Sequence, residues 1–248
     1  MFPDKKAIRP DSTVSDIVRS NHHTAEIFSK YDIEYCCGGK WPLQTVCMMK
    51  GLSFDELEVA LQTAGNALRL PPGLAYDSWD TDFLILFLKN IDHRFFLQSF
   101  PITLSVVKRF AEGHVKKFPE MQQVWATLLQ LQTAVLRQVH HEEETIFPYI
   151  SQVAHAYDNK DSYAKLLVKT LRKPLETVMK TGTNEVMTPL LALRTLTKDY
   201  LAPLNACVSH GVALKRLKDM DDALVQHLYL ENEILFPRAI SIEKQLLQ

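Results

Sequence analysis

The stretch that decides the fold is HLYLENEILFPR (residues 227–238), which has a near copy in QVHHEEETIFPY (residues 138–149). In each stretch a glutamate, Glu142 or Glu231, stands six residues before the proline of a Phe-Pro pair. His227 stands four residues before Glu231, and residues at i and i+4 share one face of an α-helix. The pattern therefore predicts two helices that each direct a carboxylate toward a common site.

The rest of the chain also has the periodicity of helices. Four long segments show it, at about residues 81–113, 119–154, 161–200 and 205–246. Helices joined by short polar turns pack antiparallel, and four of them form a bundle. No segment alternates as a strand does, and the chain has only 8 glycines. The predicted fold class is all-α, with kinks or interruptions of the third segment at Pro174, Pro189 and Pro203.

A break at Pro71-Pro72 divides the chain, because consecutive prolines stop a helix and extend the backbone. We expect a small N-terminal helical domain at residues 1–70, a linker at 71–80 and the bundle at 81–248. Within the first domain, helical patterns cover residues 14–30 and a segment that starts at Ser53, where Glu56 completes a capping box. Between them, the glycine pair of YDIEYCCGGK interrupts any helix.

Composition and charge exclude several classes of protein. A net charge of −1 gives no reason to expect nucleic acid or an anionic membrane as a partner. The longest apolar run, at residues 83–88, is too short to span a bilayer. The first residues lack the apolar core of a secretory signal. Four cysteines, two of them adjacent, do not suggest a disulfide framework. We therefore expect a reduced, cytoplasmic protein.

The histidines and glutamates of the bundle predict a metal site. His227 and Glu231 on one helix and Glu142 on another can reach one ion, and His93 and His114 lie on or just after the first helix. Such a mixed nitrogen and oxygen set suits iron, manganese or zinc, and the carboxylates favour iron. The alternative is that the HHEEE run is a solvated face and that each Phe-Pro pair ends a helix. Because the glutamate is duplicated together with the apolar residues, we favour the metal.

Four features follow one another along the chain: the string YDIEYCCGGK, the linker, an E…IFP motif and the string HLYLENEILFPRA. In this the chain resembles, over nearly its whole length, the iron–sulfur cluster repair proteins of the RIC, ScdA or YtfE type. The resemblance implies a small N-terminal domain followed by a hemerythrin-like four-helix domain. It also implies a non-haem di-iron centre, held by histidines and two bridging glutamates. Members of the family support the recovery of iron–sulfur enzymes damaged by nitric oxide or peroxide, as iron donors.

The resemblance carries over to the metal ligands at five positions. These are His93, His114, Glu142, His227 and Glu231. Gln138 and Thr183, the latter preceded by Gly182, stand where the family has two further histidines. His141 lies about 60° from Gln138 around the helix and can turn inward as a substitute, whereas His140 faces outward. The sequence leaves open a depleted di-iron centre, a single well-held metal, or none.

The adjacent thiols Cys36 and Cys37 form a second candidate site. Thiols in a glycine turn near Lys40 are accessible, and thiolates bind metals and exchange disulfides. The alternative is that they pack the turn, as we expect of Cys47 and Cys207. The resemblance implies that Cys36 and Cys37 serve the repair function.

Three functions compete. The leading one is repair of damaged iron–sulfur proteins or their scaffolds by iron donation, with nitric oxide or oxygen as possible ligands; iron donation requires no turnover, so enzymatic activity stays open. A reversible oxygen carrier fits poorly, because it needs a full set of imidazoles. A metal-depleted bundle that acts as a sensor or an interaction module is supported by Gln138 and Thr183. The sequence does not indicate an oligomeric state.

Overall fold

The computed structural model describes residues 8–36, 39–64, 74–204 and 206–248. Within these residues the regular structure is helical, and the one β-type pairing is an isolated bridge between Thr13 and Pro42. This confirms the predicted all-α fold class. The chain divides into two compact units, one formed by residues 1–70 and 200–217 and the other by residues 71–199 and 218–248.

The first unit consists of short helices. They are α1 (Val14–Ser20), α2 (Thr24–Lys30), α3 (Leu43–Lys50), α4 (Phe54–Thr63) and the beginning of α11 (Val208–Tyr229). The single helix expected over residues 14–30 is two helices, because Asn21 ends α1 and its side chain accepts a hydrogen bond from the His23 amide at 3.1 Å. The start of α4 agrees with the capping box, since the Ser53 hydroxyl accepts from the Glu56 amide at 3.4 Å. Helix α3 was not expected.

Gly39 holds the turn that follows the cysteine pair. Its carbonyl accepts hydrogen bonds from the Ser15 amide at 2.8 Å and from the Ser15 hydroxyl at 2.6 Å. A Cβ atom at this position would lie 2.3 Å from the carbonyl oxygen of Tyr35, so only glycine fits here. Residues 37 and 38 lie outside the described residues. The helix break expected in this segment is present from Gly39 onward.

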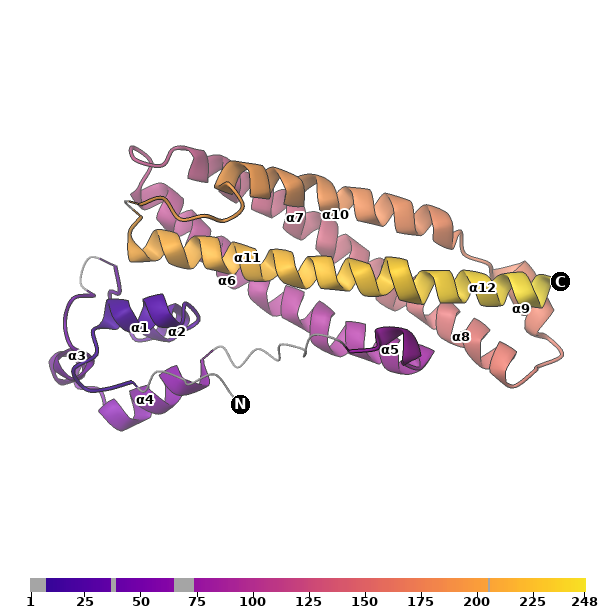
Figure 1. Cartoon of the computed structure of the whole chain (residues 1–248), viewed down its shortest axis with the longest axis horizontal. Coiled ribbons are helices and arrows are strands. Elements are labelled where there is room, and N and C mark those ends of the chain that lie inside the picture. The colour runs from indigo at the N-terminus through magenta and orange to yellow at the C-terminus, as the bar shows by residue number, and fades with distance from the viewer. Residues whose placement is uncertain (1–7, 37–38, 65–73, 205) are drawn as a thin grey trace. The chain divides into compact units, whose positions relative to one another are not determined.

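The second unit is the bundle of long helices (Figure 1). Its elements are η1 (Tyr76–Ser78), α5 (Thr81–Phe87), η2 (Leu88–His93), α6 (Arg94–Gly113), α7 (Glu120–His141), η3 (Glu142–Ile146), α8 (Phe147–Asp158), α9 (Ala164–Leu171), α10 (Leu175–Thr197), the end of α11, η4 (Leu230–Leu235) and α12 (Phe236–Leu247). Helix α7 packs against α6 and α10, and α12 packs against α8 and α9. Three of the four expected segments are continuous, as predicted.

The third expected segment is interrupted once. It consists of α9 and α10, which are separated at residues 172–174, and Pro174 is the N-cap of α10. Pro189 lies buried inside α10 and does not end it. Pro203 lies in the non-helical connection to α11. Of the three prolines expected to disturb this segment, two coincide with a break.

Arg238 on α12 fixes the entry to the bundle. Its guanidinium donates to the carbonyl of Asp77 at 2.8 Å and to the carbonyl of Trp79 at 2.6 Å. The Trp79 ring in turn contacts Phe83 and Phe87 edge-on, with ring centroids 4.9 and 5.2 Å apart. The last residues of the expected linker are therefore bound to the bundle, whereas residues 65–73 lie outside the described part.

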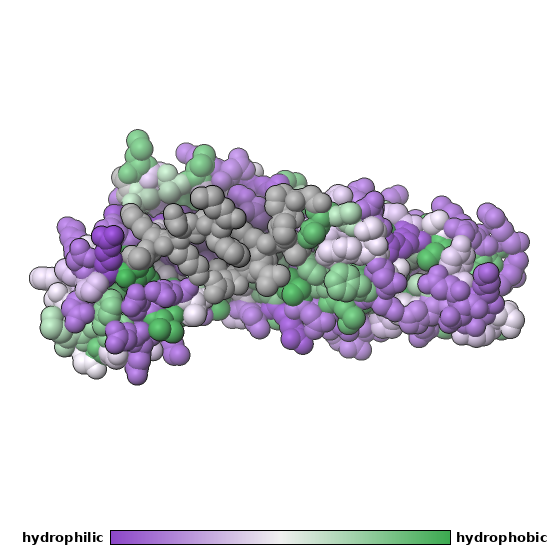
Figure 2. Space-filling model, turned by 60° about the horizontal axis from the view of Figure 1, so that its bottom comes forward, coloured by the Kyte–Doolittle hydropathy of each residue, from purple (hydrophilic) through white to green (hydrophobic). Residues whose placement is uncertain are grey.

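The interior of the bundle is apolar and its surface is mixed. Phe96, Phe100, Phe147 and Phe236 are among the largest fully buried side chains. Hydrophilic residues are spread over the bundle's visible surface in Figure 2, with hydrophobic ones between them. In the part of the chain that the structure describes, no helix combines the length and the apolar character needed to cross a membrane.

Candidate metal centre

A π turn interrupts the α-helix at each of three places in the bundle where a predicted ligand lies. His93 ends η2, Glu142 begins η3 and Glu231 lies in η4. Wider turns of this kind are rare in proteins, and those that occur often lie at functional sites. Pro148 and Pro237 stand two residues after the ends of η3 and η4, and a proline ring clashes with the carbonyl four residues before it in a regular helix. The wider turn relieves that clash, so the duplicated Phe-Pro pair marks the local widening at each glutamate.

The structure brings together four of the predicted ligands. Nitrogen or oxygen atoms of His93, Glu142 and His227 all lie within 4.8 Å of one another. The Oε2 atom of Glu142 is 3.0 Å from Nε2 of His93 and 3.5 Å from Nε2 of His227. The Oε2 atom of Glu231 is 3.4 Å from Nε2 of His227. All four residues are at most 2% exposed, so they form a buried cluster between helices.

In each histidine of the cluster, Nε2 faces the glutamates described above, and a further carboxylate lies beside Nδ1. His93 Nδ1 lies 2.7 Å from Glu143 Oε1, and His227 Nδ1 lies 3.4 Å from Asp92 Oδ2. A carboxylate at Nδ1 keeps the proton there and leaves the Nε2 lone pair for a metal. Sequence analysis missed Asp92 and Glu143, although each is adjacent to a predicted ligand. Neighbours in a regular helix point about 100° apart, and that spacing gave no reason to group them.

Asp92→Asn tests this support of His227. The amide keeps the shape of the carboxylate but not its charge, so we expect the affinity for ferrous iron to fall by about 10–100-fold, as for other groups that orient a metal ligand. Competition with a chelator under anaerobic conditions measures the affinity. Asp222→Asn is the matched control, because Asp222 is exposed and pairs with Lys218 on the same helix. An Asp92→Asn protein with wild-type affinity would show that this carboxylate does not support the site.

The charges of the cluster are strongly coupled. Burial raises the pKa of Glu142, but hydrogen bonds from His227 and His93 outweigh it and hold that pKa far below its ordinary value. Burial lowers the pKa of His227, yet the charge of Glu231, the hydrogen bond with Asp92 and the contact with Glu142 raise it well above its ordinary value. Burial and the charge of Glu142 raise the pKa of Glu231. Two buried carboxylates side by side need cations or protons between them.

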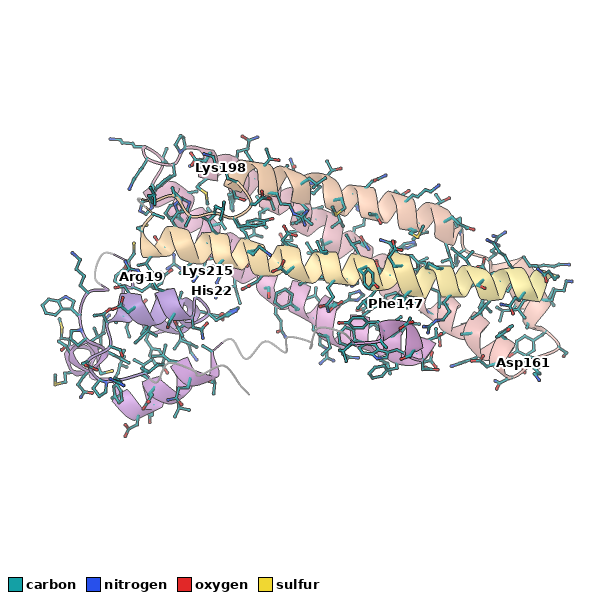
Figure 3. The ribbon with its side chains drawn as sticks, viewed as in Figure 1. Arg19, His22, Phe147, Asp161, Lys198 and Lys215 are labelled. Atoms are coloured by element: carbon teal, nitrogen blue, oxygen red, sulfur yellow. The ribbon has the colours of Figure 1, made fainter. Side chains whose placement is uncertain are left out.

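Aromatic rings enclose the two imidazoles. The ring of Phe147, which is labelled in Figure 3, is stacked on that of His93, with centroids 5.6 Å apart and planes 10° apart. The Phe96 ring meets the His227 ring at 89°, with centroids 5.4 Å apart. These contacts fix the ring orientations and exclude water from this side of the cluster.

Two other predicted ligands lie elsewhere. His114 caps the far end of α6, roughly 30 Å of helix from His93. Its ring stacks on Phe110, with centroids 4.4 Å apart, and its Nδ1 is 3.1 Å from the Phe110 carbonyl oxygen. The structure therefore does not bring His114 to the cluster. His141 is exposed, as is His140, and both line a cavity beside the cluster instead of joining it.

That cavity has a volume of about 570 Å³ and lies where the sequence lacks two expected histidines. Gln138 lines it and donates from Nε2 to Glu231 Oε2 at 3.0 Å. A Cβ atom on Gly182 would lie 3.5 Å from Gln138 Oε1, which is ordinary contact. The Thr183 hydroxyl accepts from the Asn232 amide at 2.9 Å. The helix α10 side of the site thus supplies no imidazole.

The residues present fit one metal ion. Ligand atoms of His93, Glu142 and His227 lie within 4.8 Å of one another, and Glu231 Oε2 lies beside them, 3.4 Å from His227 Nε2. A second ion would need ligands from α7 and α10. There the Gln138 amide is bound to Glu231, and Gly182 has no side chain. The donor set does not fit the second ion of a di-iron centre.

Cysteines also come together in the first unit. The Ser209 hydroxyl donates to Cys36 Sγ at 3.3 Å, and Cys207 Sγ lies 3.2 Å from the same hydroxyl. Both cysteines are partly exposed, so the expectation that Cys207 serves packing alone missed its proximity to Cys36. Cys37 lies outside the described residues. Cys47 is buried, as expected of a packing cysteine, and burial raises the pKa of its thiol.

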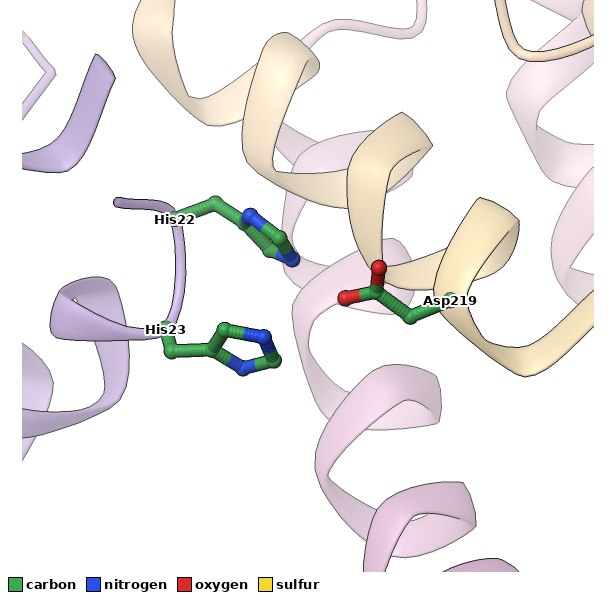
Figure 4. Close-up of side chains that lie close together, drawn as sticks. All are labelled: His22, His23 and Asp219. Carbon is green, nitrogen blue, oxygen red and sulfur yellow. The ribbon is translucent and has the colours of Figure 1, made fainter. Parts of the chain in front are cut away.

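His22 and His23 lie in the turn between α1 and α2. Their rings are tilted by 33° with centroids 4.2 Å apart, and both point away from the turn in Figure 4. Each is half-buried.

Fold and site define an all-α protein in which a helical bundle encloses a buried histidine and glutamate cluster. Residues 10–65 match the ScdA_N family model, described as a domain of unknown function (DUF542). The chain is 23% identical to the iron-sulfur cluster repair protein YtfE of Enterobacter sp. (strain 638), over 94% of this chain and 98% of that protein. It is 23% identical to the iron-sulfur cluster repair protein ScdA of Staphylococcus epidermidis, over 93% and 99%. A probable iron-sulfur cluster repair protein of Haemophilus influenzae is also 23% identical, over 92% and 96%. The resemblance expected from the motifs is confirmed.

Proposed function

We propose that the bundle binds one iron ion and donates it to iron–sulfur proteins whose clusters nitric oxide or peroxide has damaged. The observation that carries this proposal is the buried cluster of His93, Glu142, His227 and Glu231. The names of the similar proteins support the repair role. We place this activity in the cytoplasm, where damaged iron–sulfur enzymes and reduced thiols occur together.

The donor set supports iron as the metal. Imidazole and carboxylate ligands together suit ferrous iron, whereas an all-oxygen set would favour magnesium and a thiolate set zinc. When bound, ferrous iron supplies open coordination positions for nitric oxide or oxygen. The protein's own contribution is to orient the imidazoles through Asp92 and Glu143 and to balance the buried carboxylates. Manganese and zinc are competitors for the same ligands.

We assign a transfer role to the thiols of the first unit. Cys36 lies within hydrogen-bond distance of a hydroxyl that also contacts Cys207, and Cys37 is its neighbour in sequence. Cys207 also lines a cavity of about 340 Å³. Thiolates bind iron, so these side chains can hold the ion while it passes to a client protein. This role requires iron exchange and no catalytic turnover.

A second function is favoured by one observation. A cavity lies beside Gln138 and Gly182, where a complete di-iron site would need further ligands. A bundle with a weakened centre can serve as a sensor of nitric oxide or oxygen, or as an interaction module, without giving up iron.

Transfer of iron to a damaged cluster separates these functions. A [4Fe–4S] dehydratase is inactivated with nitric oxide and incubated anaerobically with the iron-loaded protein, a reductant and a chelator that removes free iron. We expect recovery of dehydratase activity together with a matching loss of iron from the protein. Cys36→Ser should slow recovery severalfold and leave the initial iron content unchanged. If the protein keeps its iron while the dehydratase stays inactive, the sensor or interaction function replaces the donor function.

A further inference from the structure

The cavity beside the metal cluster has the size and position of a ligand site. Its volume of about 570 Å³ lies within the range of small-molecule pockets. Exposed residues such as His140 and Glu144 line one part of it, and the buried residues Glu142 and Glu231 line another. The cavity therefore leads from the surface of the bundle to the cluster. All of its lining residues belong to the second unit.

Small residues on α10 create this space. Gly182 has no side chain, and the side chain of Thr183 is bound to Asn232. The Cβ position on Gly182 meets the Gln138 side chain at ordinary contact distance, so a side chain at position 182 can be added without a clash at its first atom. The cavity is a consequence of the residues that replace the two expected histidines.

Two buried oxygens on the wall of the cavity require hydrogen-bond donors. Glu231 Oε1 and Gln138 Oε1 have no partner among the described residues, and Glu231 is only 1% exposed. Leaving a buried acceptor unpaired costs about 1–3 kcal/mol. The other oxygen of Glu231 already accepts from Gln138 Nε2. A molecule in the cavity that donates N–H groups would satisfy both free oxygens.

The rest of the wall defines the other properties of the ligand. Val178, Met179 and Phe236 contribute apolar surface that suits a flat hydrocarbon body. Carboxylates outnumber cationic groups on the wall, and the one guanidinium there, of Arg137, is bound to Glu185 at 3.2 Å. The cavity therefore favours a cation over an anion of the same shape.

We propose that this cavity binds a small planar cation of the amidine or guanidine type, whose N–H groups donate to Glu231 Oε1 and Gln138 Oε1 and whose apolar body contacts Val178, Met179 and Phe236. The N–H groups of such a ligand pair with the two buried acceptor oxygens, and the carboxylate of Glu144 in the exposed part of the wall favours its positive charge. The ligand uses Oε1 of Glu231, whereas Oε2 of the same side chain lies beside His227 at the iron centre proposed above. Its site is formed by the chain alone, so it can be tested without iron.

Benzamidine is the probe, and benzoate is its anionic counterpart of the same shape. Binding of each to the metal-free full-length protein is measured by calorimetry and repeated with iron-loaded protein. We expect benzamidine to bind at least tenfold more tightly than benzoate. Gly182→Leu should weaken benzamidine at least tenfold, because the new side chain occupies the cavity. Leucine also favours helix over glycine, so this variant should fold.

Thr188→Leu is the matched control, since Thr188 is exposed on the same helix and lies outside the cavity lining. It should bind benzamidine as the wild type does. Equal binding of benzamidine and benzoate, or unchanged binding in Gly182→Leu, would overturn the proposal. Absence of binding would overturn it as well and would mean that water satisfies the two oxygens. If the protein binds benzamidine but no iron, the ligand site is supported and the proposed iron-donor function is contradicted. If it binds iron but no benzamidine, the ligand site is contradicted and the proposed function stands.

Discussion

We expect Glu231→Ala to lose at least about 100-fold in affinity for ferrous iron, which exceeds the effect of removing a group that only orients a ligand. Glu231 lies 3.4 Å from His227 Nε2 and has a free buried oxygen, so its removal takes away a ligand and a negative charge together. The metal-free variant should remain folded, because the charge of Glu142 raises the pKa of the buried Glu231 and removing Glu231 relieves this unfavourable contact. Elemental analysis and thermal unfolding measure the two effects separately.

His140→Ala is the control for this result. His140 is exposed in the other copy of the motif, at residues 138–149, and lines only the cavity wall, so its removal should leave iron content unchanged. Equal loss of iron in both variants would mean that the cluster has been assigned to the wrong face of α7. A Glu231→Ala protein that retains its iron would mean that the other three residues hold the metal without it.

The double variant Gln138→His and Gly182→His should raise the iron content from one ion to two per chain. A histidine at position 182 faces Gln138, because the Cβ position there lies 3.5 Å from Gln138 Oε1. Two imidazoles, one on α7 and one on α10, would add a second set of ligands beside Glu142 and Glu231. Iron analysis after anaerobic loading gives the number, and the spectrum after oxidation reports whether the ions are bridged.

The single variants and Thr183→His are the controls. Each single variant supplies one imidazole and should stay near one iron. Thr183→His tests the position that sequence comparison alone selects. Thr183→His is therefore also combined with Gln138→His. If this combination gains a second iron and the combination of Gln138→His with Gly182→His does not, position 183 is the ligand position and the geometric assignment of position 182 is wrong.

Much of the fold follows from periodicity, and its exceptions have local causes. The segment predicted at residues 119–154 corresponds to α7, η3 and α8 from Glu120 to Asp158. Periodicity could not separate α1 from α2, because the turn depends on the side chain of Asn21. Nor did it show that Pro189 would stay inside α10, since the cost of one lost hydrogen bond is offset by burial in the bundle.

For the site, spacing and duplication identified the residues that meet. His93, Glu142, His227 and Glu231 were predicted from motifs and converge in the structure. The predicted segment at residues 81–113 already put His93 and His114 about 30 Å apart, and the structure shows that this distance excludes His114 from the cluster. The π turns at the ligands were also not predicted, because the Phe-Pro pairs that follow two of them were interpreted only as part of the duplicated motif.

The supporting carboxylates Asp92 and Glu143 illustrate the same limit. Both are adjacent to a ligand in sequence, and their contacts with His227 and His93 appear only when helices are assembled. Gln138 and Thr183 were recognised as departures from the expected ligands, and the structure places Gly182 beside Gln138. That they enclose a cavity with two unpaired oxygens required the packed structure.

The most direct test of the central claim is the iron content of the wild-type chain after anaerobic loading with ferrous iron and removal of loosely bound metal. One iron per chain is expected, because ligand atoms of His93, Glu142 and His227 lie within 4.8 Å of one another with Glu231 beside His227, and α10 supplies no imidazole. Two irons per chain, with the spectrum of a bridged pair on oxidation, would contradict the single-metal site. No bound iron would contradict the proposed iron-donor function itself.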